Sequence, residues 1–297
     1  MNSADLSPQT PINTIHSFLL FDSQNGGDAN AHWGTLLSNA YPEIGDLALH
    51  DQLLVWANLS FRNREQELKL HGFVEYFAGC GSLAKSCLTV GMEGVRFDKA
   101  YDEKHNVLTP TGLRLWLDEL AATRAGALIW LGTLCSPFLF LCRCQSKRSV
   151  KNGYLGDDSV NWVCNGNNMM RASALIFFIA SLIFAEPMLE QPVNSVMPKC
   201  APLKTVFQFL EATRTMTWLG AYGGASPKPI QLMHLYPIYA NLRREKPKGQ
   251  EFQPLVTKKK GKVTGKKEEL KNSQEYPTAF AEEVASLTEL RLCGTKQ

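Results

Sequence analysis

The chain has 297 residues, of which 44% are hydrophobic and 20% are charged, and its formal net charge at pH 7 is +3. This length suits one large α/β domain with extensions, and so small a charge does not by itself indicate nucleic acid. Eight scattered cysteines and a start without a basic, then apolar, leader favour reduced thiols inside a cell and predict an intracellular protein, nuclear or cytoplasmic. The most apolar run, 172–185, is too short for a membrane span.

Two segments precede the main domain. Residues 1–40 are rich in Ser, Asn, Gly and Pro, which predicts a mobile or poorly packed lead-in. Residues 41–71 form a predicted helical extension, since apolar residues recur there at steps of three and four, namely Leu49, Leu53, Trp56 and Leu59.

The stretch 73–83 is organised around two glycines. An apolar run enters it, and a helix-like segment follows. Because glycine has no Cβ, Gly79 and Gly81 allow a tight turn and a close approach of the backbone to a ligand. The helix that begins near Ser82 presents free N–H groups at that place. The pattern therefore predicts a strand that delivers a cofactor to a helix N-terminus, although a tight turn without a ligand has the same glycines.

Two cofactors fit this loop. Gly79, Gly81 and Ala84 satisfy the G-x-G-x-x-(G/A) pattern of dinucleotide sites, and Asp98 follows 19 residues after the first glycine, so a NAD(P)-dependent oxidoreductase stays open. S-adenosylmethionine (SAM) suits the acid and the aromatic ring before the glycines, Glu75 and Phe77. The acid can face the ammonium group, and the ring can lie against the sulfonium or the adenosine.

Later strands end in polar residues. The strand predicted over 94–98 ends at Asp98, which can accept both ribose hydroxyls. After a helix that starts at Thr109-Pro110, a doubly buried strand over 127–131 leads to Cys135. A buried helix over 168–182 and an interior strand over 184–189 lead to Glu190. Since the carboxyl ends of parallel strands form one rim, these groups are predicted to converge on one site.

The segment Phe77-Ala-Gly-Cys-Gly, with Leu83, resembles the first motif of the cytosine-C5 DNA methyltransferases. Over about 72–235 the chain is also similar to uncharacterised algal relatives of that family. The resemblance implies a Rossmann-like methyltransferase domain over 72–240: a mostly parallel sheet with a C-terminal antiparallel hairpin and helices on both faces. It implies SAM as cofactor, held by Glu75, Phe77, Ala78, Gly79, Cys80, Gly81, Leu83, Asp98 and Lys99.

The same resemblance implies the catalytic pair. Cys135 aligns with the family's nucleophile, although Leu134 and Ser136-Pro137 flank it here instead of the family's Pro-Pro-Cys-Gln. Glu190 aligns with the glutamate that binds the target ring. The Arg-x-Arg pair of the family is missing. Three alternatives stay open: a small buried cysteine, an amino-methyltransferase loop at 136–138, and a degenerate copy that binds nucleic acid or a partner without turnover.

Positive side chains suggest nucleic acid as the partner, DNA or RNA. Arg143, Lys147 and Arg148 lie in a long connection, 142–168, where a phosphate backbone would pass. Ser226 and Lys228 lie in the turn of a hairpin predicted from 217–222 and 230–236. Residues 241–272 form a basic flexible segment, and 273–297 a helix that folds back on the core. No metal is expected, because Cys142-x-Cys144 with Cys164 lacks zinc spacing.

Overall fold

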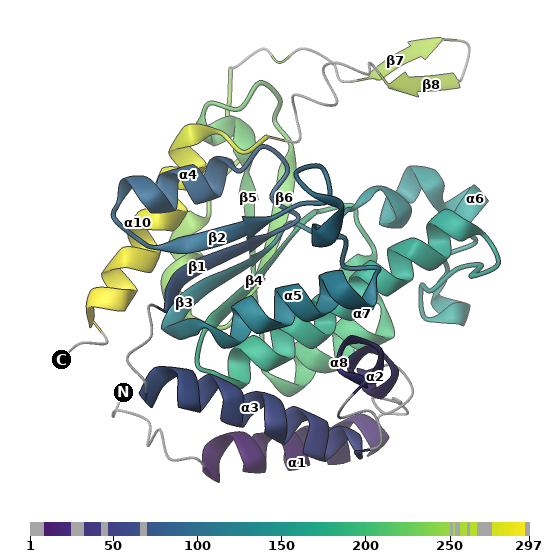
Figure 1. Ribbon diagram of the computed structural model, residues 1–297. Helices are drawn as coiled ribbons and strands as arrows, with labels where there is room; N and C mark the ends of the chain where they lie inside the picture. Colours follow the sequence, from purple (N-terminus) through teal and green to yellow (C-terminus); the bar gives the residue numbers. More distant parts are fainter. Residues whose placement is uncertain are drawn as a thin grey trace.

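The computed structural model describes residues 9–24, 33–42, 47–65, 70–249, 252, 256–259, 262–265 and 275–294. Its centre is a six-stranded sheet with helices on both faces (Figure 1). The strands lie in the order β2-β1-β3-β4-β6-β5. They are β1 (His71–Tyr76), β2 (Gly94–Phe97), β3 (Thr123–Leu131), β4 (Glu186–Pro192), β5 (Thr213–Trp218) and β6 (Pro229–His234).

Five of the six strands run in the same direction, and β6 runs opposite to them. β1 pairs in parallel with β2 and β3, and β3 pairs in parallel with β4. β6 runs antiparallel to both of its neighbours, β4 and β5. The expected α/β architecture with a mostly parallel sheet and a C-terminal antiparallel hairpin is confirmed.

Helices bury both faces of the sheet in two apolar clusters. On one face α4 (Ser82–Thr89) packs against α10 (Thr278–Gly294). On the other lie α5 (Pro110–Ala121), α7 (Asn161–Leu182) and α8 (Ala201–Phe209), with α1 (Gln9–Gln24), α2 (Thr35–Ala40) and α3 (Leu49–Glu65) packed outside them (Figure 1). Successive side chains of a strand alternate between the faces, so Phe73 enters one cluster and Val74 the other.

The sheet changes winding direction at β1. The chain passes from β1 through α4 to β2 on one side, then through α5 to β3 on the opposite side of β1. The two connecting helices therefore cover different faces, and a crevice opens at the carboxyl ends of β1 and β3. Open α/β sheets bind ligands at such a switch point.

The N-terminal lead-in differs from the expectation. Its described part is helical and packed: Ile15 and Phe18 of α1 are buried. The ring of Phe18 lies 5.0 Å from that of Trp33 and 4.2 Å from that of Phe178, centroid to centroid. A few large apolar side chains at helical spacing are enough to seat α1 on the domain, although the composition around them is polar.

Other boundaries also move. α7 begins at Asn161 rather than at 168, and the connection before it contains the short helix α6 (Arg143–Ser146). Several Asn and a Gly in the first turns of α7 have weak helix propensity, which hid its start. β5 ends at Trp218, and a 3₁₀ turn covers 219–222, where the strand was expected.

The basic segment is described only in part. β7 (Val256–Lys259) and β8 (Lys262–Gly265) pair as an antiparallel hairpin. Lys260, Lys266 and Lys267 lie outside the described residues. Within the described part of the chain, no helix has the length and apolar character needed to cross a membrane.

Candidate cofactor and acceptor cavity

A cavity of about 990 Å³ opens at the carboxyl ends of the parallel strands. It gathers most of the site residues that the sequence predicted. Six cofactor candidates line it together with the catalytic pair and one nucleic-acid candidate: Phe77, Ala78, Gly79, Cys80, Asp98, Lys99, Cys135, Glu190 and Lys228. Glu75, Gly81 and Leu83 do not line it, and neither do Arg143, Lys147, Arg148 and Ser226.

The loop after β1 is held open toward this cavity. Phe77, Gly79 and Gly81 have φ angles of +57°, +56° and +70°. No heavy atom lies within 4 Å of the place where a Cβ on Gly79 would stand, apart from its chain neighbours. A left-handed residue facing empty space is what a close-fitting ligand needs. The strained Phe77 beside it indicates that the fold imposes this shape.

Asp98 locks the end of β2 to this loop. Its Oδ2 accepts a hydrogen bond from the N–H of Gly79 at 2.9 Å, and its Oδ1 accepts one from the N–H of Ala100 at 2.8 Å. The hydroxyl of Tyr101 donates to the carbonyl oxygen of Gly79 at 2.6 Å. Each carboxylate oxygen has a second lone pair, so Asp98 can still accept from ligand hydroxyls.

Glu75 does not play the role that the sequence suggested. The side chain is fully buried, and its Oε2 accepts a hydrogen bond from the N–H of Ala84 in the first turn of α4, at 2.9 Å. Burial raises its pKa to about 7. Glu75 therefore caps α4 from behind the loop instead of reaching the cavity, and Leu83 is equally buried in the core.

Cys135 stands at the start of the 3₁₀ turn after β3 and is half-buried in the cavity wall. Burial, and after it the charge of Glu190, raises the pKa of its thiol to about 11, although the charge of Lys228 opposes the rise. On the other face of β4, the Gln191 amide donates to the carbonyl oxygen of Thr133 at 2.6 Å and ties the cysteine loop to the sheet.

Glu190 is 6% exposed and depends on a residue far along the chain. The hydroxyl of Tyr276 donates to its Oε2 at 3.0 Å, and the indole N–H of Trp130 donates to the Tyr276 oxygen at 3.2 Å. The other carboxylate oxygen, Oε1, has no hydrogen-bond partner within the described residues. A buried acceptor without a donor is costly, so a ligand that brought a donor to Oε1 would be favoured there.

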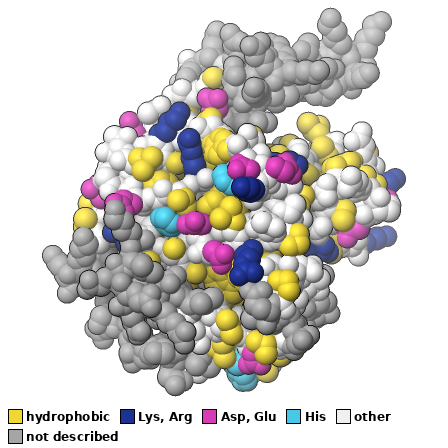
Figure 2. Space-filling model, in the orientation of Figure 1, with side chains coloured by type: hydrophobic (Ala, Val, Ile, Leu, Met, Phe, Trp, Pro, Cys, Tyr) yellow, Lys and Arg dark blue, Asp and Glu magenta, His cyan; other side chains and the backbone are white. Residues whose placement is uncertain are grey.

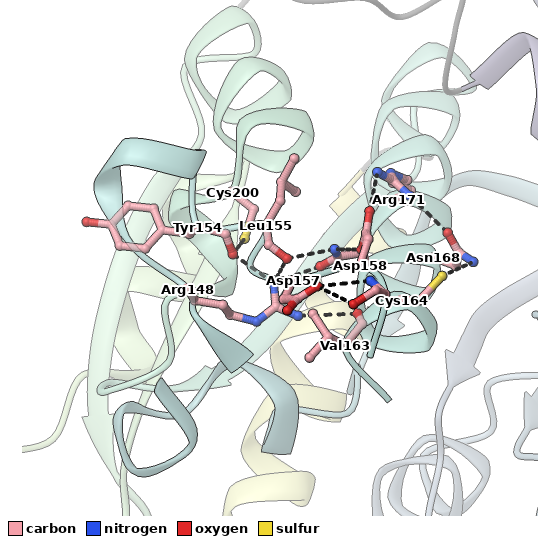
Figure 3. A network of polar contacts seen from close by, with 12 residues as sticks. Arg148, Tyr154, Leu155, Asp157, Asp158, Val163, Cys164, Asn168, Arg171 and Cys200 are labelled. Atoms are coloured by element: carbon pink, nitrogen blue, oxygen red, sulfur yellow. Dashed lines mark hydrogen bonds and ion pairs between the residues drawn. The ribbon is translucent and has the colours of Figure 1, made fainter. Parts of the chain in front are cut away.

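Arg148 is an internal support, so the expectation that it contacts phosphate is wrong. It is 3% exposed, and its guanidinium donates to the carbonyl oxygens of Pro137 and Tyr154 and to Oδ1 of Asn167, each at 2.7 Å. Figure 3 shows Arg148 in a network of polar contacts between the connection before α7 and α7 itself. The guanidinium lies 4.0 Å from the centroid of the Phe138 ring. Arg148 thereby fixes the loop that carries Cys135.

The other nucleic-acid candidates divide between surface and interior. Lys147 is exposed, and the half-buried Arg143 places its guanidinium 5.1 Å from the Phe140 ring centroid. Ser226 is 4% exposed and so is not a surface contact in this structure, whereas Lys228 reaches the cavity. Figure 2 shows basic, acidic and apolar side chains interspersed over the viewed face, without one dominant sign of charge.

Several cavity residues were not predicted as part of a site. Trp162, Asn165 and Met169 form one face of α7 at steps of three and four, and a helix start at 161 would have exposed this pattern. Trp116 lies on α5, where its spacing is typical of a residue that packs on the sheet. Tyr276 lies just before α10, and no local signal ties it to Glu190, 86 positions away.

Within the described residues, no group of three or more His, Cys, Asp or Glu side chains could hold a metal ion. A scan against protein-family models and a search of curated proteins found no match to this chain.

Proposed function

We propose that the protein is a SAM-dependent methyltransferase that acts on a base in nucleic acid, of the cytosine-C5 type. One observation carries the proposal: a single cavity joins the Gly79–Asp98 edge to Cys135 and Glu190. Its volume of about 990 Å³ lies at the upper end of the range for small-molecule sites, which suits a cofactor and a base side by side.

The cofactor half fits SAM better than a dinucleotide. A dinucleotide places its pyrophosphate on the free N–H groups of the first helix, but the buried carboxyl of Glu75 already accepts from the first turn of α4. With a pKa of about 7, Glu75 is partly ionised at neutral pH, and its negative charge disfavours a phosphate at this place, whereas SAM carries none of those phosphates. When bound, SAM supplies a methyl group on a positively charged sulfonium. Gly79, Cys80 and Asp98 are the residues that would hold it.

The sheet supports the same assignment. β6 lies between β4 and β5 and is antiparallel to both. The sheet of Rossmann-like methyltransferases ends in such a hairpin, and the strand order agrees with that class.

The acceptor half contains the groups that cytosine chemistry requires. The Cys135 thiolate would form a bond to ring carbon C6, while Glu190 holds a proton at N3, so that electron density moves to C5. With the thiol pKa at about 11, roughly one Cys135 in ten thousand is a thiolate at pH 7. Pairing of Glu190 with a protonated ring nitrogen would offset the charge that raises this pKa. Base binding would thereby help to activate the nucleophile.

Nucleic acid is the acceptor class that the segment after the Cys135 loop favours. Phe140, Leu141 and Val150 are 62%, 69% and 75% exposed beside the cations Arg143 and Lys147. An exposed aromatic ring next to positive charge can stack an unpaired base and hold its phosphate. A base that is already single-stranded would also reach Cys135 without the cost of unpairing and unstacking that flipping it out of a duplex requires.

A second candidate is a protein that binds these ligands without turnover. The specific observation in its favour is the raised pKa of Cys135, which the charge of Lys228 and a backbone hydrogen bond offset only in part. The two candidates differ at Cys135→Ser, which would abolish methyl transfer in an enzyme and leave every measurable property of a binding protein unchanged.

The test is calorimetric titration with SAM, S-adenosylhomocysteine and NADH. We expect micromolar binding of the first two, at least tenfold weaker in Asp98→Asn and unchanged in Asp51→Asn, an exposed acid on α3. Transfer of a labelled methyl group to single-stranded and duplex oligonucleotides then tests the acceptor. Tight binding of NADH with indifference to SAM, or no binding of any of the three, would refute the proposal.

A further inference from the structure

Three aromatic and acidic residues form a directed chain of hydrogen bonds beside the cavity. The indole nitrogen of Trp130 can only donate, and it donates to the hydroxyl oxygen of Tyr276 at 3.2 Å. The hydroxyl of Tyr276 has a single proton, and it donates this proton to Oε2 of Glu190 at 3.0 Å. Oε2 is thereby held as an acceptor.

The ring of Tyr276 has little freedom to leave this position. It meets the Trp130 ring edge-on at 5.4 Å and the Phe280 ring at 5.6 Å, centroid to centroid. The backbone that follows is equally fixed, because the carbonyl oxygen of Pro277 accepts from the N–H groups of Phe280 and Ala281. Tyr276 also stands directly before α10, which packs on α4. The C-terminal helix therefore brings a hydrogen-bond donor to a carboxylate on β4.

We propose that Tyr276 is a positioning residue: supported by Trp130, it occupies Oε2 of Glu190 and leaves Oε1 as the atom that holds a proton against the bound acceptor. A carboxyl whose Oε2 accepts from a hydroxyl carries its own proton, when it has one, on Oε1. Oε1 has no other partner within the described residues. The role in catalysis rests on the function proposed above, but the arrangement of the proton does not.

Alkylation of Cys135 reports on this arrangement without requiring methyl transfer. The charge of Glu190 raises the pKa of the Cys135 thiol, so the rate at which iodoacetamide labels Cys135 follows that charge. We expect Glu190→Gln to raise the rate at pH 8 about tenfold, which corresponds to one pKa unit. Labelling of Cys135 itself, rather than of the other cysteines, is followed by mass spectrometry of its peptide.

Tyr276→Phe removes only the hydroxyl. The carboxylate of Glu190 then loses the donor that holds it in place and can turn away from Cys135, which weakens the effect of its charge on the thiol. We expect the rate to rise about threefold at pH 8, and to rise no further when Tyr276→Phe is added to Glu190→Gln. A purely structural role would change the rate by the same factor in both backgrounds.

Tyr239→Phe is the matched control. Its hydroxyl is also buried and bonds to Thr288 of α10 at 3.0 Å, but Tyr239 does not contact Glu190. It should leave the Cys135 rate unchanged. The inference would be overturned if Tyr276→Phe changed the rate of Cys135 labelling by the same factor in the wild type and in Glu190→Gln. It would also be overturned if Tyr276→Phe changed the rate in neither background. Titration with S-adenosylhomocysteine on the same variants is read separately, so a missing cofactor would count against the proposed function alone.

Discussion

Arg148 gives the sharpest contrast between a structural and a binding role for a positive charge. Arg148→Met keeps an unbranched side chain and removes a guanidinium that lies over the Phe138 ring and donates to three oxygens at 2.7 Å. Each buried acceptor that loses its donor costs about 1–3 kcal/mol, and relief of the buried charge returns part of this. We expect a loss of about 3 kcal/mol in the free energy of unfolding, or roughly 5 °C in Tm.

Urea unfolding followed by circular dichroism measures this loss, with Lys147→Met as the control on the neighbouring exposed residue. The control should leave stability within about 0.5 kcal/mol and weaken nucleic-acid binding instead. Because the guanidinium holds the carbonyl of Pro137, Arg148→Met should also loosen the Cys135 loop and speed labelling of Cys135. A variant of unchanged stability with a reduced salt dependence of nucleic-acid binding would refute the reasoning and restore Arg148 as a phosphate contact.

Three further predictions concern the cavity and its support. Glu75→Gln removes a carboxyl whose pKa is raised to about 7 in the folded protein. Because the folded state binds the proton of Glu75 more tightly than the unfolded chain does, the stability of the wild type falls as the pH rises from about 4.5 to 7. Relative to the wild type, the free energy of unfolding of the variant, measured with urea, should rise by on the order of 3 kcal/mol from pH 5 to pH 8. An equal difference between variant and wild type at the two pH values would contradict this. Lys228→Met removes the cation that lowers the Cys135 pKa, so iodoacetamide labelling at pH 8 should slow about threefold, and a faster reaction would exclude that role. Gly79→Ala and its control Gly153→Ala each place a Cβ in open space on a residue with a φ of +56°. Each substitution should lower the free energy of unfolding by about 1 kcal/mol. Only Gly79→Ala should weaken the binding of S-adenosylhomocysteine, at least tenfold by calorimetry.

Local patterns carried much of the fold. The glycine loop at 79–81, the buried strand that contains Trp130 and the amphipathic helix that begins at Pro110 are all visible in neighbouring residues. The carboxyl-end positions of Asp98, Cys135 and Glu190 follow once the strands are parallel, and the structure brings the three into one cavity. Boundaries failed where propensity was weak, as at the Asn-rich start of α7.

What the sequence alone determined is therefore the order of strands and helices, the parallel sheet and the loop that carries Gly79. What only the tertiary structure decided is the role of individual charged and polar groups. Glu75 caps a helix, Arg148 holds a loop, and Tyr276 reaches Glu190 from 86 positions away. The reason is physical: a spacing pattern records which face a residue occupies, but hydrogen bonds and desolvation depend on which distant segments fold against that face.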